Sequence, residues 1–158
     1  MKNQLATEYL TTAVGILKIE ADNVGITAIG FVSQTDKVFV ANQHTQQAAL
    51  ELSEYFAGKR TEFNVALNSK GTEFQQQVWL QLSKIPYGQT CSYGDIAKNI
   101  NNPKAVRAVG AANGRNPITI IVPCHRVIGS NGKLTGYAWG TSIKSALLTL
   151  ESNPKCKP

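Results

Sequence analysis

The segment at residues 58–71, GKRTEFNVALNSKG, separates two parts of the chain whose apolar residues follow different periods. Before it, AVGILKIEA and GITAIGFV are rich in β-forming residues and are separated by the turn-prone DNVG, a pattern typical of strands. After it, apolar residues recur at helical spacing. We therefore expect two domains, residues 1–70 and residues 71–158, joined by this polar connection, which can include a short strand.

A helix over residues 45–57 is expected to follow the strands of residues 7–40. Thr45 is a suitable N-cap, and Gly58 stands where a glycine commonly ends a helix. Three apolar residues would form the face of this helix that packs on the sheet: Ala49, Leu52 and Phe56.

The second domain is predicted to begin with a helix in TEFQQQVWLQLSKIP, a run that Pro86 closes. Its apolar residues recur at helical spacing: Phe74, Val78, Leu82 and Ile85. Ser92 and Asp95 resemble a capping box, in which two side chains satisfy backbone N–H groups reciprocally, and so predict the start of a second helix.

A third helix would follow closely, because Asn102 can cap it, Pro103 suits its first turn and Gly114 can end it. Two short helices joined by a tight turn indicate a helix-turn-helix. Three residues are expected to face the core: Val106, Val109 and Asn113. On another face Arg107 is the only long side chain, beside three small residues: Gly110, Ala111 and Gly114. Helices that read base edges carry several long polar residues, so this face fits either close approach to a nucleic-acid backbone or a buried, alanine-packed helix.

The basic excess of the chain lies entirely in its second half. Residues 1–70 carry six Lys/Arg and seven Asp/Glu, whereas residues 71–158 carry ten and three. This distribution favours a polyanionic partner for the second half. On charge alone, a basic surface that only keeps the protein in solution fits equally well.

Composition excludes several classes of protein. No apolar run approaches the roughly 20 residues that a membrane-spanning helix needs, and residues 1–10 lack the apolar core of a signal peptide. Three cysteines cannot form a closed disulfide framework, and with two histidines and no Cys-x-x-Cys pair they do not indicate zinc. We therefore expect a cytoplasmic protein with no membrane contact and no metal site.

The apolar segment at residues 118–129, ITIIVPCHRVIG, contains a thiol next to an imidazole. We expect this segment to be a strand, in which Cys124 and His125 point to opposite faces. Free cysteines and core histidines are often inert. However, a proline before Cys124, a glycine-rich loop after it and a basic helical pair ahead of it favour a nucleophile.

The hexapeptide PCHRVI, residues 123–128, resembles the active-site motif of the O6-alkylguanine-DNA alkyltransferases, also called methylated-DNA–protein-cysteine methyltransferases. The stretches FQQQVWLQLSKIPYGQTCSYGDIA, NPKAVRAVGAANGRNPITIIVPCHRVIGSNGKLTGYAWG and KSALLTLE are similar to the family pattern in the same order. The resemblance covers residues 72–151, while residues 1–70 fit the family's looser, RNase H-like N-terminal domain.

The resemblance implies an α+β fold, with the RNase H-like domain followed by a mostly helical DNA-binding domain. It also implies a monomer that repairs double-stranded DNA containing O6-alkylguanine. The protein would flip the damaged base out and accept its alkyl group irreversibly, in one turnover. This single-turnover reaction is also expected to need no cofactor. Neither a preference between methyl and larger groups nor activity on O4-alkylthymine follows from the sequence.

By the same resemblance, Cys124 would be the nucleophile that accepts the alkyl group. His125 and Glu151 would form its activating relay, with one water molecule between the thiol and the imidazole. Asn116 would be the hinge between the helix-turn-helix and the active site.

The resemblance assigns the remaining residues to DNA. Tyr93 would crowd the neighbouring phosphate, hydrogen-bond the flipped base and neutralise the leaving guanine, while Arg107 would fill the gap in the base stack. Further DNA contacts are expected from residues on or beside the third helix: Ala105, Gly110, Ala111 and Arg115. Four residues would line the guanine pocket: Val127, Tyr137, Ala138 and Trp139. The family typically has serine or arginine at the position of Ala138, where a backbone N–H makes the contact.

Three other functions share parts of this pattern. A cysteine hydrolase also uses Cys, His and a carboxylate, but the residues around Cys124 do not resemble one. A helix-turn-helix transcription regulator would leave Cys124 unexplained, and an alkyltransferase-like damage sensor would lack the thiol. Cys91, at a helix entrance, and Cys156, in the tail NPKCKP, are not expected to be nucleophiles.

Overall fold

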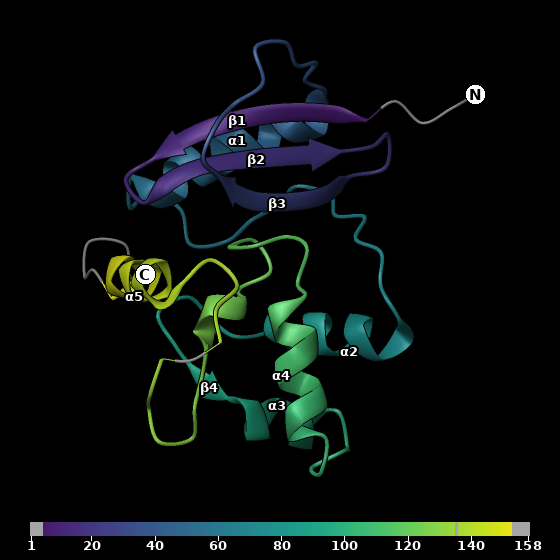
Figure 1. Ribbon diagram of the computed structural model, residues 1–158, viewed down its shortest axis with the longest axis vertical. Coiled ribbons are helices and arrows are strands. Elements are labelled where there is room, and N and C mark those ends of the chain that lie inside the picture. The colour runs from purple at the N-terminus through teal and green to yellow at the C-terminus, as the bar shows by residue number, and fades with distance from the viewer. Residues whose placement is uncertain (1–4, 135, 153–158) are drawn as a thin grey trace. The chain divides into compact units, whose positions relative to one another are not determined.

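The computed structural model describes residues 5–134 and 136–152, so Cys156 lies outside the described residues. Two compact units make up this part of the chain, one ending at Lys70 and the other running from Gly71 to Ser152. The elements of the first unit are β1 (Ala6–Thr12), β2 (Gly15–Ala21), β3 (Ile26–Val32) and α1 (Gln43–Phe56) (Figure 1). The elements of the second are α2 (Glu73–Leu82), β4 (Cys91–Ser92), α3 (Tyr93–Asn99), α4 (Val106–Gly114), the 3₁₀ turn η1 (Cys124–Arg126), β5 (Val127–Ile128) and α5 (Thr141–Glu151).

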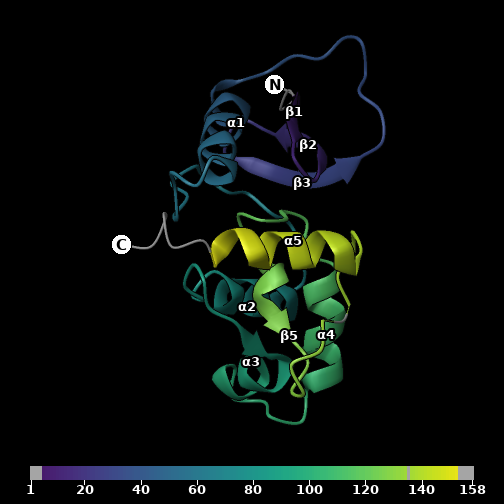
Figure 2. The same ribbon diagram turned by 90° about the vertical axis from the view of Figure 1, so that its left-hand side faces the viewer.

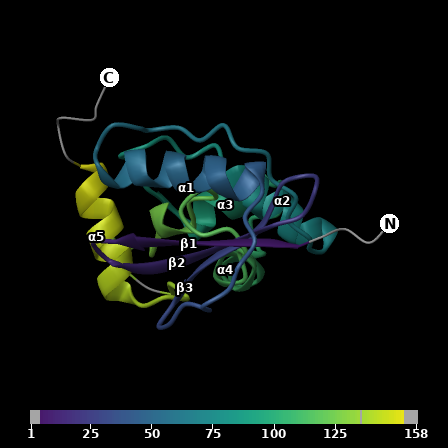
Figure 3. The ribbon, with the colours of Figure 1, turned by 90° about the horizontal axis from the view of Figure 1, so that it is seen from above.

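The first unit is an antiparallel sheet in the order β1-β2-β3, with α1 packed on one face (Figure 3). Alternate residues of β2 are buried, as a strand with one covered face requires: Leu17, Ile19 and Ala21. The prediction that strands continue to residue 40 is wrong, because residues 33–40 form a loop. This loop contacts the sheet edge through the Thr7 N–H, which donates to the Val40 carbonyl over 2.8 Å.

Helix α1 begins earlier than predicted. Asn42 is its N-cap, and the Asn42 side chain accepts hydrogen bonds from the N–H groups of His44 and Thr45. Thr45 is therefore the third helical residue of a capping box, and the prediction that it is the N-cap is wrong. The end at Gly58 is confirmed, since its φ of 74° is a left-handed conformation that favours glycine. The buried apolar residues of the helix are Ala48, Leu52 and Tyr55, so the predicted face is only partly correct.

In the second unit, capping boxes open α2 and α3. The first joins Thr72 to Gln75, and the second joins Ser92 to Asp95 as predicted. Helix α2 ends at Leu82, earlier than its apolar pattern suggested. The Trp79 indole N–H donates to the Ala112 carbonyl over 2.9 Å and so attaches α2 to α4. Figure 2 shows α2, α3, α4 and α5 arranged around β5.

Helix α4 has no side-chain cap, so the prediction that Asn102 is its N-cap is wrong. Asn102 instead accepts the Ala105 N–H at its carbonyl over 3.0 Å, within a separate turn before the helix. Val106 is 41% exposed rather than in the core, whereas Ala112 is buried. The predicted end of the helix at Gly114 is confirmed.

The apolar segment before Cys124 is not a strand, contrary to prediction. Its hydrogen bonds are local: the Val122 N–H donates to the Ile118 carbonyl over 3.0 Å. Ile120 has a φ of 73°, which is rare for a β-branched residue, and its side chain is fully buried. The segment therefore consists of tight turns, and Cys124 at its end is buried.

Candidate active site

Cys124 begins the single turn η1 and is 5% exposed. Consecutive side chains of a 3₁₀ turn are separated by about a third of a revolution, so Cys124 and His125 diverge even though the segment is not extended. The Nδ1 atom of His125 is buried and has no hydrogen-bond partner among the described residues. The thiol and the imidazole are thus adjacent without a direct hydrogen bond.

A buried network surrounds the other side of the imidazole. His125 Nε2 lies 2.6 Å from Glu151 Oε2. Arg126 donates from Nε to Glu151 Oε1 over 2.7 Å and from Nη2 to Oε2 over 3.0 Å. Its Nη1 donates to the Ile85 carbonyl over 2.7 Å, and its guanidinium lies over the Tyr87 ring. The Glu151 carboxylate is therefore held on both oxygens.

The charge state of this network follows from its contacts. Burial alone would raise the pKa of Glu151, but the hydrogen bonds and charges of His125 and Arg126 together lower it to about 2. Burial lowers the pKa of His125, and the Glu151 carboxylate only partly opposes that shift. At neutral pH the pair is therefore a carboxylate that accepts Nε2–H from a neutral imidazole, whose Nδ1 can accept a proton.

The Cys124 thiol is not ionised by its surroundings alone. Burial raises its pKa, while hydrogen bonds from the side chains of Asn116 and Thr119 and the charge of Lys144 oppose the shift. Asn116 is held by its own amide, which donates to the Val122 carbonyl over 2.7 Å and accepts the Ile118 N–H over 3.0 Å. The thiol consequently needs a base before it can act as a nucleophile.

Three further hydrogen-bonding side chains of the second unit are buried: Thr119, Tyr137 and Lys144. The Tyr137 and Thr119 hydroxyls are 2.6 Å apart. Lys144 donates from Nζ to the Val127 carbonyl over 2.5 Å. Val127 and Tyr137 are buried, as residues that line a pocket would be, whereas Ala138 and Trp139 are exposed.

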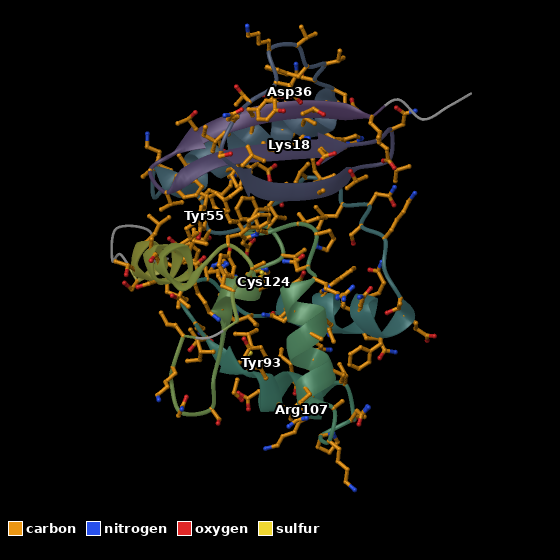
Figure 4. The ribbon with its side chains drawn as sticks, viewed as in Figure 1. Lys18, Asp36, Tyr55, Tyr93, Arg107 and Cys124 are labelled. Atoms are coloured by element: carbon orange, nitrogen blue, oxygen red, sulfur yellow. The ribbon has the colours of Figure 1, made fainter. Side chains whose placement is uncertain are left out.

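Tyr93 begins α3 and lies against two glycines. A Cβ placed on Gly136 would be 3.2 Å from the Tyr93 hydroxyl, and one on Gly110 would be 3.9 Å from its ring. In Figure 4, Tyr93 lies between Cys124 and Arg107. Arg107 is the second residue of α4. The small residues of α4 and the loop therefore leave space for this side chain beside the site.

The other predicted DNA-binding residues are not gathered around Cys124. They lie along the outer surface of α4 or at its ends, exposed or half-buried: Ala105, Arg107, Gly110, Ala111 and Arg115. The structure thus separates a buried chemical site from an outer surface with small and basic residues.

Three residues of the buried site were not predicted from the sequence: Thr119, Arg126 and Lys144. A signal existed for Lys144, because it shares one face of α5 with Leu147 and Glu151 at positions i, i+3 and i+7. The roles of the other two depend on partners distant in the sequence.

Two further findings concern the described residues as a whole. In the ranges 5–134 and 136–152, no three His, Cys, Asp or Glu side chains are grouped so that they could hold a metal ion. None of the described helices is long and apolar enough to cross a membrane.

Comparison with known proteins identifies the family. The family described as 6-O-methylguanine DNA methyltransferase, DNA binding domain, matches residues 73–153, and its ribonuclease-like domain matches residues 5–69. The chain belongs to this family. Its two matched domains confirm the predicted α+β fold, with an RNase H-like N-terminal domain before a DNA-binding domain.

Named relatives agree along nearly the whole chain. A methylated-DNA–protein-cysteine methyltransferase of Methanosarcina acetivorans is 51% identical over 146 residues, which are 89% of this chain and 94% of that protein. The constitutive enzyme of the same name from Bacillus subtilis is 50% identical over 90% of this chain and 94% of its own. The Mycobacterium tuberculosis O6-methylguanine methyltransferase has a TM-score of 0.86 at 44% identity, covering 98% of this chain and 96% of that one.

A second solved structure of the mycobacterial protein holds DNA. It has a TM-score of 0.84 at 47% identity and covers 92% of each chain. This relative binds DNA with the same fold.

Proposed function

We propose that this protein repairs DNA by transferring an alkyl group from O6 of guanine to Cys124. The observation that carries the proposal is the buried network of His125, Glu151 and Arg126 directly beside a buried cysteine. A cysteine hydrolase could use the same groups, but the family assignment favours alkyl transfer.

The thiol is activated through a relay. A water molecule carries the Cys124 proton to His125 Nδ1, the nitrogen that does not contact Glu151. The Glu151 carboxylate stabilises the imidazolium that forms, and Arg126 fixes the position of the carboxylate. A relayed base is sufficient, because a thiol ionises far more readily than a serine hydroxyl.

The thiolate then attacks the alkyl carbon. A sulfur–carbon bond forms as the carbon–O6 bond breaks, and the electron pair of that bond goes to the guanine. Tyr93 neutralises the leaving guanine by hydrogen bonding or proton donation. The product is an S-alkyl cysteine, which has no carbonyl for water to attack, so each molecule acts once.

The substrate must be flipped out of the duplex, because the reacting carbon is otherwise held within the stack and away from a buried thiol. Arg107, exposed near the start of α4, would occupy the vacated space. The small residues Gly110 and Ala111 allow close approach to the DNA backbone without base readout, which suits a protein that scans every sequence. Val127, Tyr137, Ala138 and Trp139 would receive the flipped guanine.

We propose further that Asn116 serves as the hinge of the site, and that Ala105 and Arg115 contact the DNA backbone. The protein would act as a monomer, since one chain contains every residue of the relay. Its proposed place of action is the cytoplasm. Residues 1–70 and 71–158 would be its two functional domains.

Intact-mass measurement after mixing with duplex DNA that contains O6-methylguanine tests the proposal. The protein should gain one methyl group on the Cys124 peptide and then stop reacting. Cys124→Ala should gain none, while the matched control Cys91→Ser should react like the wild type. Several transfers per molecule at a steady rate, or methylation elsewhere, would refute the proposal.

A further inference from the structure

Asn113, on the last turn of α4, contacts the backbone of the reactive cysteine from a buried position. It is 2% exposed, and its Nδ2 donates to the Cys124 carbonyl over 3.5 Å, which is long for a hydrogen bond. Its Oδ1 is buried and has no hydrogen-bond partner within residues 5–134 and 136–152. One half of this amide is therefore weakly satisfied, and the other half is an unsatisfied acceptor.

The orientation of the Asn113 amide follows from the Cys124 carbonyl. A carbonyl can only accept hydrogen bonds, and this one already accepts the Val127 N–H at the end of η1. Turning the amide over would place two acceptor oxygens against each other. Nδ2 therefore faces the carbonyl, and Oδ1, about 2 Å from Nδ2 in the same planar group, must accept from another donor.

A second buried-site amide, Asn116, has no such need. Its Nδ2 donates to the Val122 carbonyl over 2.7 Å, and its Oδ1 accepts the Ile118 N–H over 3.0 Å. Both halves of Asn116 are thus satisfied by the backbone, as is usual for a buried amide. The unsatisfied oxygen of Asn113 is the exception that calls for an explanation.

Another buried acceptor belongs to the residue that follows Cys124. His125 Nε2 contacts Glu151 over 2.6 Å and carries the hydrogen of the neutral imidazole, so Nδ1 can only accept. Like Asn113 Oδ1, this nitrogen is buried and has no hydrogen-bond partner in the described part of the chain. Two acceptors cannot satisfy each other, and an unsatisfied acceptor in the interior is costly. Both therefore need hydrogens from a third group.

A water molecule has the hydrogens that these acceptors require. It can donate one to Asn113 Oδ1 and one to His125 Nδ1, while its oxygen accepts the hydrogen of the Cys124 thiol. Buried waters typically make about three hydrogen bonds to polar groups that are otherwise unsatisfied. The three groups belong to one small region, because Asn113 contacts the Cys124 carbonyl and the next peptide bond joins that carbonyl to His125.

Resting on the function proposed above, we propose that Asn113 positions the relay water by accepting one of its hydrogens, which directs the other hydrogen to His125 Nδ1 and the oxygen to the Cys124 thiol. During activation the water takes the thiol proton as it gives a proton to Nδ1, so it is regenerated. The hydrogen on Asn113 Oδ1 stays with the water throughout. Asn113 neither gains nor loses a proton and is a positioning residue.

The test compares Asn113→Leu with Asn113→Asp, by following the alkylation of Cys124 by iodomethane between pH 6 and pH 10. Leucine has nearly the shape of asparagine but no acceptor, so the rate near pH 7 should fall about tenfold, the effect of one lost hydrogen bond. Near pH 10, where hydroxide removes the thiol proton directly, the rate should approach that of the wild type. Asn113→Asp keeps an oxygen acceptor and should retain most of the rate at neutral pH.

The shape of the pH profile separates positioning of the water from a purely structural role. Lost packing would slow alkylation by the same factor at every pH, whereas a lost relay slows it only where the thiol needs a base. The charged groups around the imidazole are unchanged in both variants: Arg126, Lys144 and Glu151. Single-turnover methyl transfer should fall in the same order as the neutral alkylation rates. The affinity for DNA should stay at the wild-type value, because Asn113 is buried.

A direct measurement of the water needs no variant. In the wild type, a long-lived water should give a nuclear Overhauser effect to the His125 ring hydrogen that lies between the two nitrogens, and Asn113→Leu should lose it. A wild type without this effect would overturn the inference, even if Asn113→Leu does not fold.

The inference would also be overturned by an unchanged neutral rate in Asn113→Leu, by equal slowing at every pH, or by an Asn113→Asp variant as slow as Asn113→Leu. Iodomethane needs neither DNA nor guanine, so these outcomes do not depend on the natural substrate. A wild type that shows the expected profile but accepts no methyl group from DNA would refute the proposed function and leave the role of Asn113 in thiol activation standing.

Discussion

Two buried glutamates on helices, one in each unit, perform different tasks. Glu51 on α1 accepts the backbone N–H groups of Asn64 and Val65 at one oxygen and the Gln47 amide at the other. Glu151 on α5 contacts the side chains of His125 and Arg126, both of which belong to η1. Both carboxylates are buried on helices, so burial and helical structure do not identify a reactive carboxylate. The hydrogen-bond partners distinguish them. Backbone N–H donors indicate a structural role for Glu51, whereas an imidazole whose second nitrogen can accept a proton indicates a relay at Glu151.

Glu151→Gln should have the largest effect, on both the rate of transfer and the free energy of unfolding. The amide cannot stabilise an imidazolium, so single-turnover transfer should fall about a hundredfold, in the range typical of lost acid–base assistance. The substitution also leaves the Arg126 guanidinium buried without its counter-charge, which should lower the free energy of unfolding by about 3–5 kcal/mol. Rapid-quench kinetics and urea titration measure the two effects. A wild-type transfer rate would mean that Glu151 is only structural.

Arg126→Lys should affect stability more than chemistry. An ammonium cannot bind both carboxylate oxygens and the Ile85 carbonyl in the fork geometry of a guanidinium, so unfolding should become easier by about 2 kcal/mol. His125 and Glu151 would still be in contact, and transfer should fall less than in Glu151→Gln. If Arg126→Lys reacts more slowly than Glu151→Gln, the guanidinium has a chemical role that its contacts do not indicate.

The stability difference between the wild type and Glu151→Gln should depend on pH in acid. The pKa of Glu151 is about 2 in the folded protein and about 4.3 in an unfolded chain. Its carboxylate therefore adds stability that is fully present above the unfolded value and is lost as the pH falls from about 5 towards 2. The difference in unfolding free energy between the two proteins should shrink over that window. Parallel curves would show that the carboxylate is not stabilised as its contacts imply.

Glu51→Gln should have the smallest effect. The amide oxygen can still accept the Asn64 N–H, so the loss should be about 1 kcal/mol, the size of a typical hydrogen bond. Methyl transfer should proceed at the wild-type rate, which makes this variant the matched control for Glu151→Gln. A tenfold slower transfer would contradict the assignment of Glu51 to structure alone.

Local signals in the sequence predicted much of the fold. The capping box of Ser92 and Asp95 needs only residues three positions apart, and the glycines at 58 and 114 act within one turn. The predictions were wrong where the same residues are compatible with two local structures. Asn42 and Thr45 can both cap a helix, and the buried segment before Cys124 has an apolar run that cannot be distinguished from a strand by periodicity.

The site was predictable to the extent that family resemblance named its residues. His125 and Glu151 are in contact, but no pattern in the chain indicates an imidazole and a carboxylate that are 26 positions apart. Arg126 could not be interpreted as buried, because its burial depends on Glu151 and on the Ile85 carbonyl. Thr119 could not be recognised either, because its hydrogen bond to Tyr137 joins residues 18 positions apart, beside a left-handed turn at Ile120.

The position of Glu151 at the last residue of α5 has a consequence for the order of assembly in the cell. Synthesis at about 5–20 residues per second places roughly 4 to 16 seconds between Lys70 and Glu151. The residues of the sheet and α1 are all made before that interval begins. Arg126 is made 25 residues before Glu151, and until Glu151 follows, its guanidinium lacks the carboxylate that allows it to be buried. The growing chain therefore carries an unassisted thiol until the final turn of α5 is made. Protection of the second unit against protease on stalled ribosomes should accordingly appear only once Glu151 is available to fold.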